Sequence, residues 1–133
     1  MNKLDQIADL FQKGSVLHQQ NYFVEAQAIY EKILCIQPDH FDTLQLLGSL
    51  LAQIKKYSEA VKYLSKALEI NPGDARTLCN QGIVLKELKR FDEALVSYAQ
   101  AILVNPSYAD AFNNQGIVLQ ELKRFDEALA SYD

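Results

Sequence analysis

Cysteine, proline and glycine are scarce in this sequence of 133 residues, which contains 2 cysteines, 3 prolines and 5 glycines. The cysteines, Cys35 and Cys79, are 44 residues apart. Two residues at this spacing cannot build a disulfide framework, and they match no metal-ligand or redox motif. So few prolines and glycines leave few places where a helix can end. We therefore expect a predominantly helical protein in which both cysteines pack between helices.

An excess of basic residues and a long apolar run are also missing. The 13 Lys and Arg residues against 17 Asp and Glu residues give a net charge of -4, the wrong sign for a protein that binds a phosphate backbone. The most apolar run, residues 44–54, is much shorter than the roughly 20 residues of a membrane-spanning helix. Residues 1–12 lack the apolar core of a signal peptide. We expect no nucleic-acid partner, no membrane partner and a cytoplasmic location.

A period of 34 residues runs along the chain. It separates successive members of two sets, the prolines Pro38, Pro72 and Pro106 and the glycines Gly14, Gly48, Gly82 and Gly116. Residues 81–98 and 115–132 are identical at 16 of 18 positions. A fixed period of this length indicates duplication of one supersecondary unit.

Each repeat predicts two amphipathic helices joined by a turn. In the second repeat, residues 44–54 and 57–68 both carry apolar side chains at helical spacing. A basic pair ends the first helix and an acidic residue opens the second, which complements both helix dipoles. The second helix should stop before the proline, because the residue preceding a proline is pushed out of the helical region. In the fourth repeat the same pattern predicts a break after Arg124 and a second helix from Phe125.

These units resemble tetratricopeptide repeats, a family of 34-residue helical hairpins. The family favours small residues at positions 8 and 20 and an aromatic residue at position 17. With first positions at Ile7, Phe41, Ala75 and Ala109, the three sets are Gly14, Gly48, Gly82 and Gly116; Ala26, Ala60, Ala94 and Ala128; and Phe23, Tyr57, Phe91 and Phe125. We expect the small residues to let paired helices approach closely and the aromatic residues to be buried between hairpins.

The resemblance implies an all-α fold, a right-handed superhelical stack of antiparallel helix-turn-helix hairpins forming one domain over residues 1–133. We expect a leading turn at 1–6, complete repeats at 7–40, 41–74 and 75–108, and a shortened repeat at 109–133. Because the last repeat stops about two turns into its second helix, we expect the N-terminal part of a longer protein. The uncovered apolar edge of this repeat, which includes Leu119, Leu122, Phe125 and Leu129, predicts self-association.

The sequence offers no set of residues for catalysis or metal binding. His18 and His40 lie outside any metal-binding motif, and no nucleotide-binding glycine motif or nucleophile motif occurs. One glutamate stands near the second-helix start of each repeat, where it complements the helix dipole and forms no acid and base pair. We expect no catalytic residue, no metal and no cofactor in this segment.

In this family the first helices of the hairpins line a concave groove. The positions that face it carry mostly uncharged polar side chains with some apolar ones: Gln12, Gln45, Ser49, Arg76, Asn80, Ile83, Asn113, Asn114 and Ile117. Amides donate and accept hydrogen bonds, so that a row of them can hold the main chain of an extended peptide. A helix face in water also needs polar side chains, which is the simpler explanation for any one of them. We expect a non-catalytic scaffold that binds an extended peptide or a helix of a partner protein.

Asn80 and Asn114 occupy the same position in successive repeats. They resemble the asparagine ladder in the tetratricopeptide arm of O-linked N-acetylglucosamine transferases, where such residues hold the peptide main chain. This resemblance implies an alternative function, the substrate-recruiting arm of a larger enzyme such as a bacterial glycosyltransferase. Chaperone-binding relatives instead hold a C-terminal carboxylate with Lys, Asn and Arg. Because the fifth positions here carry no Lys and the sixth no Arg, we expect no such clamp.

Overall fold

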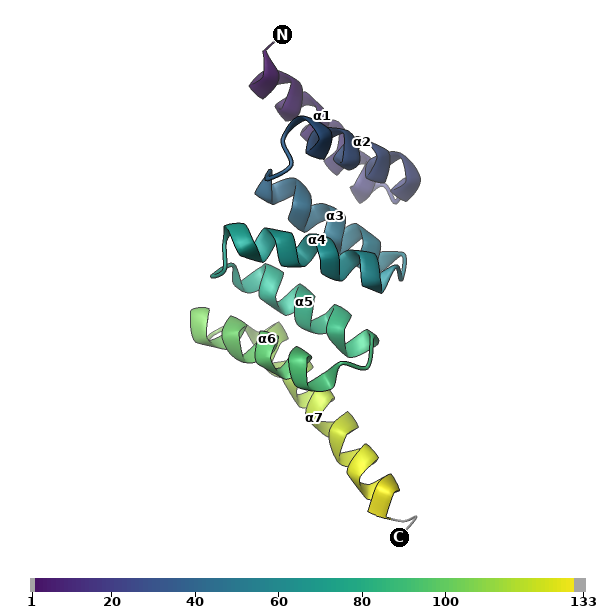
Figure 1. Ribbon diagram of the computed structural model, residues 1–133, viewed down its shortest axis with the longest axis vertical. Coiled ribbons are helices and arrows are strands. Elements are labelled where there is room, and N and C mark those ends of the chain that lie inside the picture. Colours follow the sequence, from purple (N-terminus) through teal and green to yellow (C-terminus); the bar gives the residue numbers. More distant parts are fainter. Residues whose placement is uncertain (1, 131–133) are drawn as a thin grey trace. The chain divides into compact units, whose positions relative to one another are not determined.

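The computed structural model describes residues 2–130, and these residues form seven α-helices without a strand (Figure 1). The helices are α1 (Lys3–Gln19), α2 (Phe23–Ile36), α3 (Phe41–Gln53), α4 (Tyr57–Ile70), α5 (Ala75–Glu87), α6 (Phe91–Val104) and α7 (Ala109–Ala130). The chain divides between Asn71 and Pro72 into two compact units, the first with α1 to α4 and the second with α5 to α7.

Neighbouring helices pack in pairs within each unit. In the first unit α1 packs against α2, α2 against α3 and α3 against α4. In the second unit α5 packs against α6, and α7 packs against α6 and touches α5. The pairs α1–α2, α3–α4 and α5–α6 are each joined by a turn of three residues, so that their helices run antiparallel. The predicted all-α fold of helical hairpins is confirmed.

A side chain caps the first helix of each complete repeat. The backbone N–H of the third residue beyond the cap donates to that side chain, which satisfies one of the unpaired donors at the helix start. The three bonds run from Asp5 to Asn2 at 2.8 Å, from Thr43 to His40 at 3.4 Å and from Thr77 to Asp74 at 3.0 Å. The first helices therefore start at positions that local side chains specify.

Each turn within a hairpin contains one residue in the left-handed backbone region. The φ angle is 65° at Asn21, 66° at Lys55 and 64° at Lys89. The backbone N–H of the following residue donates to a carbonyl five residues earlier, as from Lys56 to Leu51 at 2.8 Å, which forms a Schellman motif. A left-handed residue other than glycine costs about 1 to 2 kcal/mol. Packing of the second helix must offset this cost.

The second helices end before the repeated prolines, as predicted. The residue before each proline leaves the helix: φ and ψ are -138° and 92° at Gln37, -132° and 86° at Asn71 and -135° and 92° at Asn105. These angles follow from the clash between the proline ring and a helical residue that precedes it. Proline therefore sets the end of the second helix in each complete repeat.

The fourth repeat departs from the predicted break after Arg124. Helix α7 continues from Ala109 to Ala130 through the position at which the other repeats turn, so no separate second helix begins at Phe125. A continued helix avoids the cost of a left-handed residue and gains one backbone hydrogen bond per residue.

Glycine at position 8 lets the paired helices approach closely in the complete repeats. A Cβ atom placed on these glycines would lie under 3 Å from the side chain at position 24: 2.9 Å from Tyr30 at Gly14, 2.7 Å from Leu64 at Gly48 and 2.5 Å from Tyr98 at Gly82. The alanines at position 20 of these repeats, Ala26, Ala60 and Ala94, are fully buried. The predicted role of the small residues is therefore confirmed for the three closed hairpins.

The aromatic residues at position 17 are buried to different degrees. Phe91 is 8% exposed, whereas Phe23 and Tyr57 are half-buried. Phe125 is 52% exposed, so the expectation that it is buried between hairpins is wrong. Its ring still contacts that of Phe91, with the centroids 5.8 Å apart. Phe125 stays on the continuous helix α7 and does not open a second helix packed in a closed hairpin, which leaves its ring half exposed.

Candidate peptide-binding surface

The predicted groove residues all lie on α1, α3, α5 and α7, the first helices of the four repeats. In the first unit Gln12 is exposed on α1, and Ser49 is half-buried on α3. Gln45 on α3 is only 7% exposed, so that its side chain is largely withdrawn from solvent. The first unit thus presents two of its three predicted residues to a ligand.

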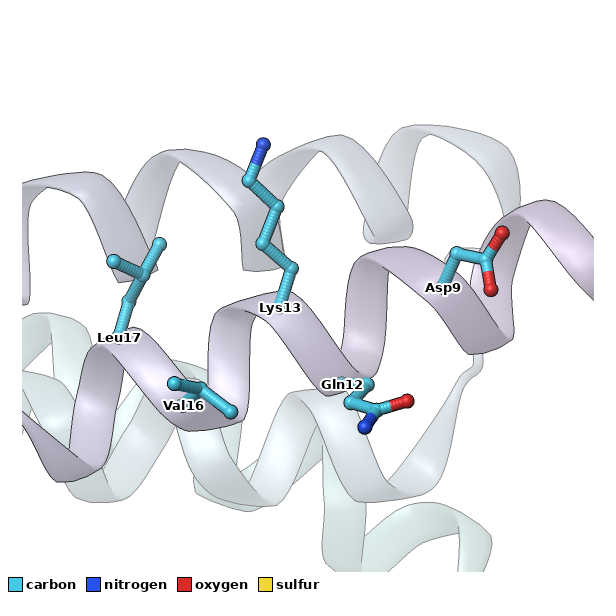
Figure 2. A pocket seen from close by; sticks show the side chains of 5 residues that line it. All are labelled: Asp9, Gln12, Lys13, Val16 and Leu17. Carbon is cyan, nitrogen blue, oxygen red and sulfur yellow. The ribbon is translucent and has the colours of Figure 1, made fainter.

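Gln12 lines a shallow hollow of about 450 Å³ on α1 (Figure 2). The hollow is also lined by Asp9, Lys13, Val16 and Leu17, so that all five side chains rise from one helix. Val16 is 43% exposed. A binding pocket usually buries most of its ligand between several elements, which one helix does not provide. We therefore interpret this hollow as an open helix flank.

His18 links three helices of the first unit, a role that the sequence analysis missed. Its Nδ1 lies 3.1 Å from the Tyr30 hydroxyl on α2, and its Nε2 lies 2.5 Å from Oε1 of Gln53 on α3. Because the Gln53 oxygen only accepts, Nε2–H is the donor there, and in a neutral ring Nδ1 accepts from Tyr30. Burial raises the pKa of Tyr30 and favours the protonated phenol that donates this bond. His18 and His40 both make contacts inside the unit.

The second unit holds the other six predicted residues. Arg76 and Asn113 are exposed, Asn80, Ile83 and Asn114 are half-buried, and Ile117 is 43% exposed. Asn114 Nδ2 on α7 donates to the Cys79 sulfur on α5 at 3.9 Å, the length of a weak bond to sulfur. This contact places the side-chain amide of Asn114 on α7 against Cys79 of α5. Cys79 directly precedes Asn80 in the sequence.

Cys79 lies buried beneath this surface and is a poor nucleophile. The residue is 2% exposed. Burial raises the pKa of its thiol, and the hydrogen bond from Asn114 lowers the pKa by less. A thiol rather than a thiolate therefore faces Asn114 near neutral pH, and the thiolate is the reactive form. Cys35 is exposed, which differs from the expectation that it packs between helices.

Charged residues gather around Tyr108, just before α7. Burial raises the pKa of the Tyr108 phenol, Cys79 and Asp110 raise it further, and Arg76 lowers it. Both signs of charge thus act near the start of α5 and α7. The sequence did not point to Tyr108, because its neighbours Asp74, Arg76 and Asp110 come from three different repeats. The resulting surface combines amides, a basic residue and an acidic residue within one unit.

A smaller hollow of about 140 Å³ lies at the other end of α5. It is lined by Lys86, Glu87, Lys89, Phe91, Ile117 and Glu121. Lys86 Nζ lies 3.2 Å from Glu87 Oε1, so one basic and one acidic lining residue pair with each other. The hollow gives Ile117 an apolar neighbour, Phe91, and polar surroundings. The six residues of the second unit therefore extend from the start of α5 to a hollow near its end.

Residues 2–130 contain neither a metal-binding cluster nor a helix suited to span a membrane. No group of three His, Cys, Asp or Glu side chains in this range is placed to hold a metal ion. No helix in the same range is both long and apolar enough to cross a membrane.

Two family profiles, both described as Tetratricopeptide repeat, match the sequence at residues 17–78 and 75–108. Together they cover more than half of the chain. The chain belongs to the tetratricopeptide repeat (TPR) family. TPR domains are generally non-catalytic interaction modules, and the fold supports a protein-interaction scaffold. No curated protein sequence matches this chain.

Several solved TPR structures are similar. The first TPR of Spaghetti (RPAP3), bound to the HSP90 peptide SRMEEVD, is 21% identical with a TM-score of 0.86, over 90% of this chain and 94% of that one. The Thermobaculum terrenum O-GlcNAc transferase is 24% identical with a TM-score of 0.83, and the aligned region covers 90% of this chain and 23% of the enzyme. A MamA structure described as AMB-1 is 27% identical with a TM-score of 0.78, over 90% of this chain and 70% of that one.

Proposed function

We propose that this TPR chain is a non-catalytic scaffold whose α5 and α7 hold the main chain of an extended peptide from a partner protein. The observation that carries the proposal is the contact at 3.9 Å between Asn114 and Cys79, which sets the amide of α7 against α5 beside Asn80. Two half-buried amides on adjacent first helices of one unit suit a peptide main chain, because each amide both donates and accepts.

The side chains around these amides favour broad recognition. Ile83 and Ile117 offer apolar contact, and Arg76 and Asn113 are exposed polar groups at the edge. This mixture provides no deep pocket that would select one side chain. Specificity in extended-peptide recognition comes from pockets for alternate side chains, whereas affinity comes largely from main-chain hydrogen bonds. The similarity to a TPR domain that binds a peptide also supports a peptide partner.

The test starts from peptides selected by the 133-residue chain from a randomised displayed library. Replacing Asn80 and Asn114 together by Ala should weaken binding of a selected peptide by about 1 to 3 kcal/mol, because the main-chain partners lose their hydrogen bonds. Gln100→Ala, at an exposed polar residue of α6, is the matched control and should leave affinity unchanged. Fluorescence anisotropy measures affinity, and far-UV circular dichroism checks that helicity is kept.

A chemical change in the peptide gives a second, independent readout. N-methylation of its main-chain amides should abolish binding, whereas single alanine substitutions along it should be tolerated. Equal affinity of the double variant and the wild-type chain would reject the proposal that Asn80 and Asn114 hold the peptide main chain. Sensitivity to one peptide side chain, with tolerance of N-methylation, would reject main-chain recognition.

A second candidate is that the chain is the substrate-recruiting arm of a larger enzyme. The similarity to the O-GlcNAc transferase supports this candidate, because 90% of the chain matches a segment that is 23% of that enzyme. Asn80 and Asn114 would then hold a protein substrate rather than a regulatory partner. The sequence of the full gene product distinguishes the candidates, and glycosyl transfer that falls in the double asparagine variant would support the second.

A further inference from the structure

The imidazole ring of His18 is held by three side chains of the first unit. The Tyr30 hydroxyl, at position 24 of the same repeat, lies 3.1 Å from its Nδ1, and Gln53 Oε1, at position 13 of the next repeat, lies 2.5 Å from its Nε2. Phe23, at position 17, makes an edge contact with the ring, with the centroids 6.0 Å apart. The surroundings of His18 therefore supply one donor, one acceptor and an aromatic wall.

The second unit carries equivalent surroundings without a histidine. Tyr98, Phe91 and Glu121, named here the Tyr98 cage, stand at the three equivalent positions, and Lys86 stands where the first unit has its histidine. Lys86 Nζ lies 3.2 Å from Glu87 Oε1, so its ammonium group pairs within its own helix. A protonated lysine donates hydrogen bonds but accepts none, so it cannot accept the proton of the Tyr98 hydroxyl.

Two observations mark the Tyr98 cage as a binding site. The Tyr98 hydroxyl is fully buried and has no hydrogen-bond partner among residues 2–130, which is costly for a buried donor. The hollow of about 140 Å³ near the end of α5 is lined by Phe91 and Glu121 of the cage and by Lys86. An imidazole ring fits in this volume, because about five water-sized groups do, at about 30 Å³ each.

We propose that the Tyr98 cage binds an imidazole ring from outside the chain, in the orientation that the His18 ring has in the first unit. The Tyr98 hydroxyl donates to one ring nitrogen, and the N–H of the other ring nitrogen donates to a Glu121 carboxylate oxygen. The edge of the ring lies against Phe91. The long side chain of Lys86 moves toward solvent to let the ring reach Tyr98.

The polar groups of the cage match the two nitrogens of the ligand. Burial raises the pKa of Tyr98, so the hydroxyl keeps the proton that it donates. Arg124 Nη1 lies 3.8 Å from Glu121 Oε1, beyond hydrogen-bond distance, so the carboxylate can accept from the ring. A phenyl ring would leave both polar groups without partners, and an ammonium group offers no acceptor. The cage therefore selects a neutral imidazole, which has one acceptor nitrogen and one N–H.

The site goes beyond the proposed function, because no cage residue belongs to the proposed peptide-binding set. The ring can come from a small imidazole compound or from a histidine side chain of a partner protein. Free imidazole and N-acetylhistidine amide distinguish these sources. Binding of both shows that a histidine side chain can enter the cage, and binding of imidazole alone restricts the site to small compounds.

NMR titration of the 15N-labelled 133-residue chain measures binding, at about pH 8, where the imidazole ring is mostly neutral. Imidazole should shift amide signals at the end of α5 and in α7, with a dissociation constant in the millimolar range, because so small a ligand gains little binding free energy. 1-Methylimidazole keeps the ring but lacks the N–H, and it should bind at least about fivefold more weakly. Replacing Asn80 and Asn114 by Ala should leave imidazole binding unchanged, which separates this site from the proposed function.

Lys86→His provides the sharpest variant, because it supplies the ring from α5 itself, as His18 does from α1. It should abolish the binding of added imidazole and raise the urea midpoint of the second unit. Lys86→Ala is the matched control, which removes the lysine without adding a ring and should keep or tighten binding. Tyr98→Phe keeps the packing of the tyrosine ring but removes the donor, and it should weaken binding at least about fivefold.

Far-UV circular dichroism checks that every variant keeps its helicity. The proposal would be overturned if tens of millimolar imidazole shifted no amide signal of α5 or α7. Binding that Lys86→His or Tyr98→Phe leaves unchanged would also overturn it, because the ligand would then lie outside the cage. Equal affinity for imidazole and 1-methylimidazole would show that Glu121 accepts no hydrogen bond from the ring, and would reject the orientation proposed here.

Discussion

Two glycines with identical neighbours should respond in opposite ways to the same substitution. Gly82 and Gly116 both lie in the pentapeptide Gln-Gly-Ile-Val-Leu, at residues 81–85 and 115–119. A Cβ on Gly82 would lie 2.5 Å from the ring of fully buried Tyr98, whereas a Cβ on Gly116 meets no described side chain within 4 Å. The intrinsic helix preference is therefore matched, and the packing differs.

The magnitudes decide the signs. Replacing glycine by alanine inside a helix gains about 1 kcal/mol. At Gly116 nothing opposes this gain, so Gly116→Ala should stabilise the fourth repeat by up to about 1 kcal/mol. At Gly82 the added methyl group overpacks the hairpin, at a cost of about 1 to 3 kcal/mol. Gly82→Ala should therefore destabilise the second unit, with a net loss of up to about 2 kcal/mol.

Urea denaturation followed by far-UV circular dichroism measures both changes, at a concentration where sedimentation shows a monomer. Hydrogen exchange of α7 amides reports the gain at Gly116 if the last repeat unfolds before the rest. Unchanged denaturation slopes would show that only stability has moved. If both variants shifted stability in the same direction, local propensity would outweigh packing, and the explanation of the glycines as close-approach residues would fail.

Two further pairs of variants compare equivalent positions in different repeats. Phe91→Ala should cost about 3 to 5 kcal/mol in a urea unfolding experiment, and Phe125→Ala about 1 kcal/mol or less, because Phe125 is 52% exposed; equal costs would contradict the open fourth repeat. Tyr98→Phe should be neutral or stabilising at pH 7, because the Tyr98 hydroxyl is buried with no hydrogen-bond partner among residues 2–130, whereas Tyr30→Phe should cost about 1 kcal/mol by removing the bond to His18. Burial raises the pKa of Tyr98, so its protonated form favours the folded chain and that stability is lost as pH rises above about 10; Tyr98→Phe should therefore lose less stability in alkali than wild type, and an identical decline would contradict this.

Most of the fold could be predicted from the sequence because its signals are local. The repeated prolines mark where the second helices end, at Ile36, Ile70 and Val104. Glycine at a fixed position marks where helices approach each other. The absence of a turn in the fourth repeat could not be predicted in this way. Lys123 has the same sequence neighbours as Lys89, and only packing decides between a turn and a helix.

The candidate site was less predictable than the fold. The resemblance to TPR proteins placed all nine residues on first helices, which depends on register alone. It did not predict that Gln45 is almost fully buried or that Asn114 contacts Cys79. It also missed the bridge from His18 to Gln53. These facts depend on distances between side chains of different helices, on which a one-dimensional pattern carries no information.

Residues 87–95 and residues 121–129 are the same peptide in two conformations. The first copy turns at Lys89, whose φ is 64°, and the second continues as a helix within α7. The local sequence therefore permits the turn, and the packing of the second helix against the first determines whether it forms. The same nine residues can therefore form either a turn or a straight helix, and the packing around them decides which conformation is adopted.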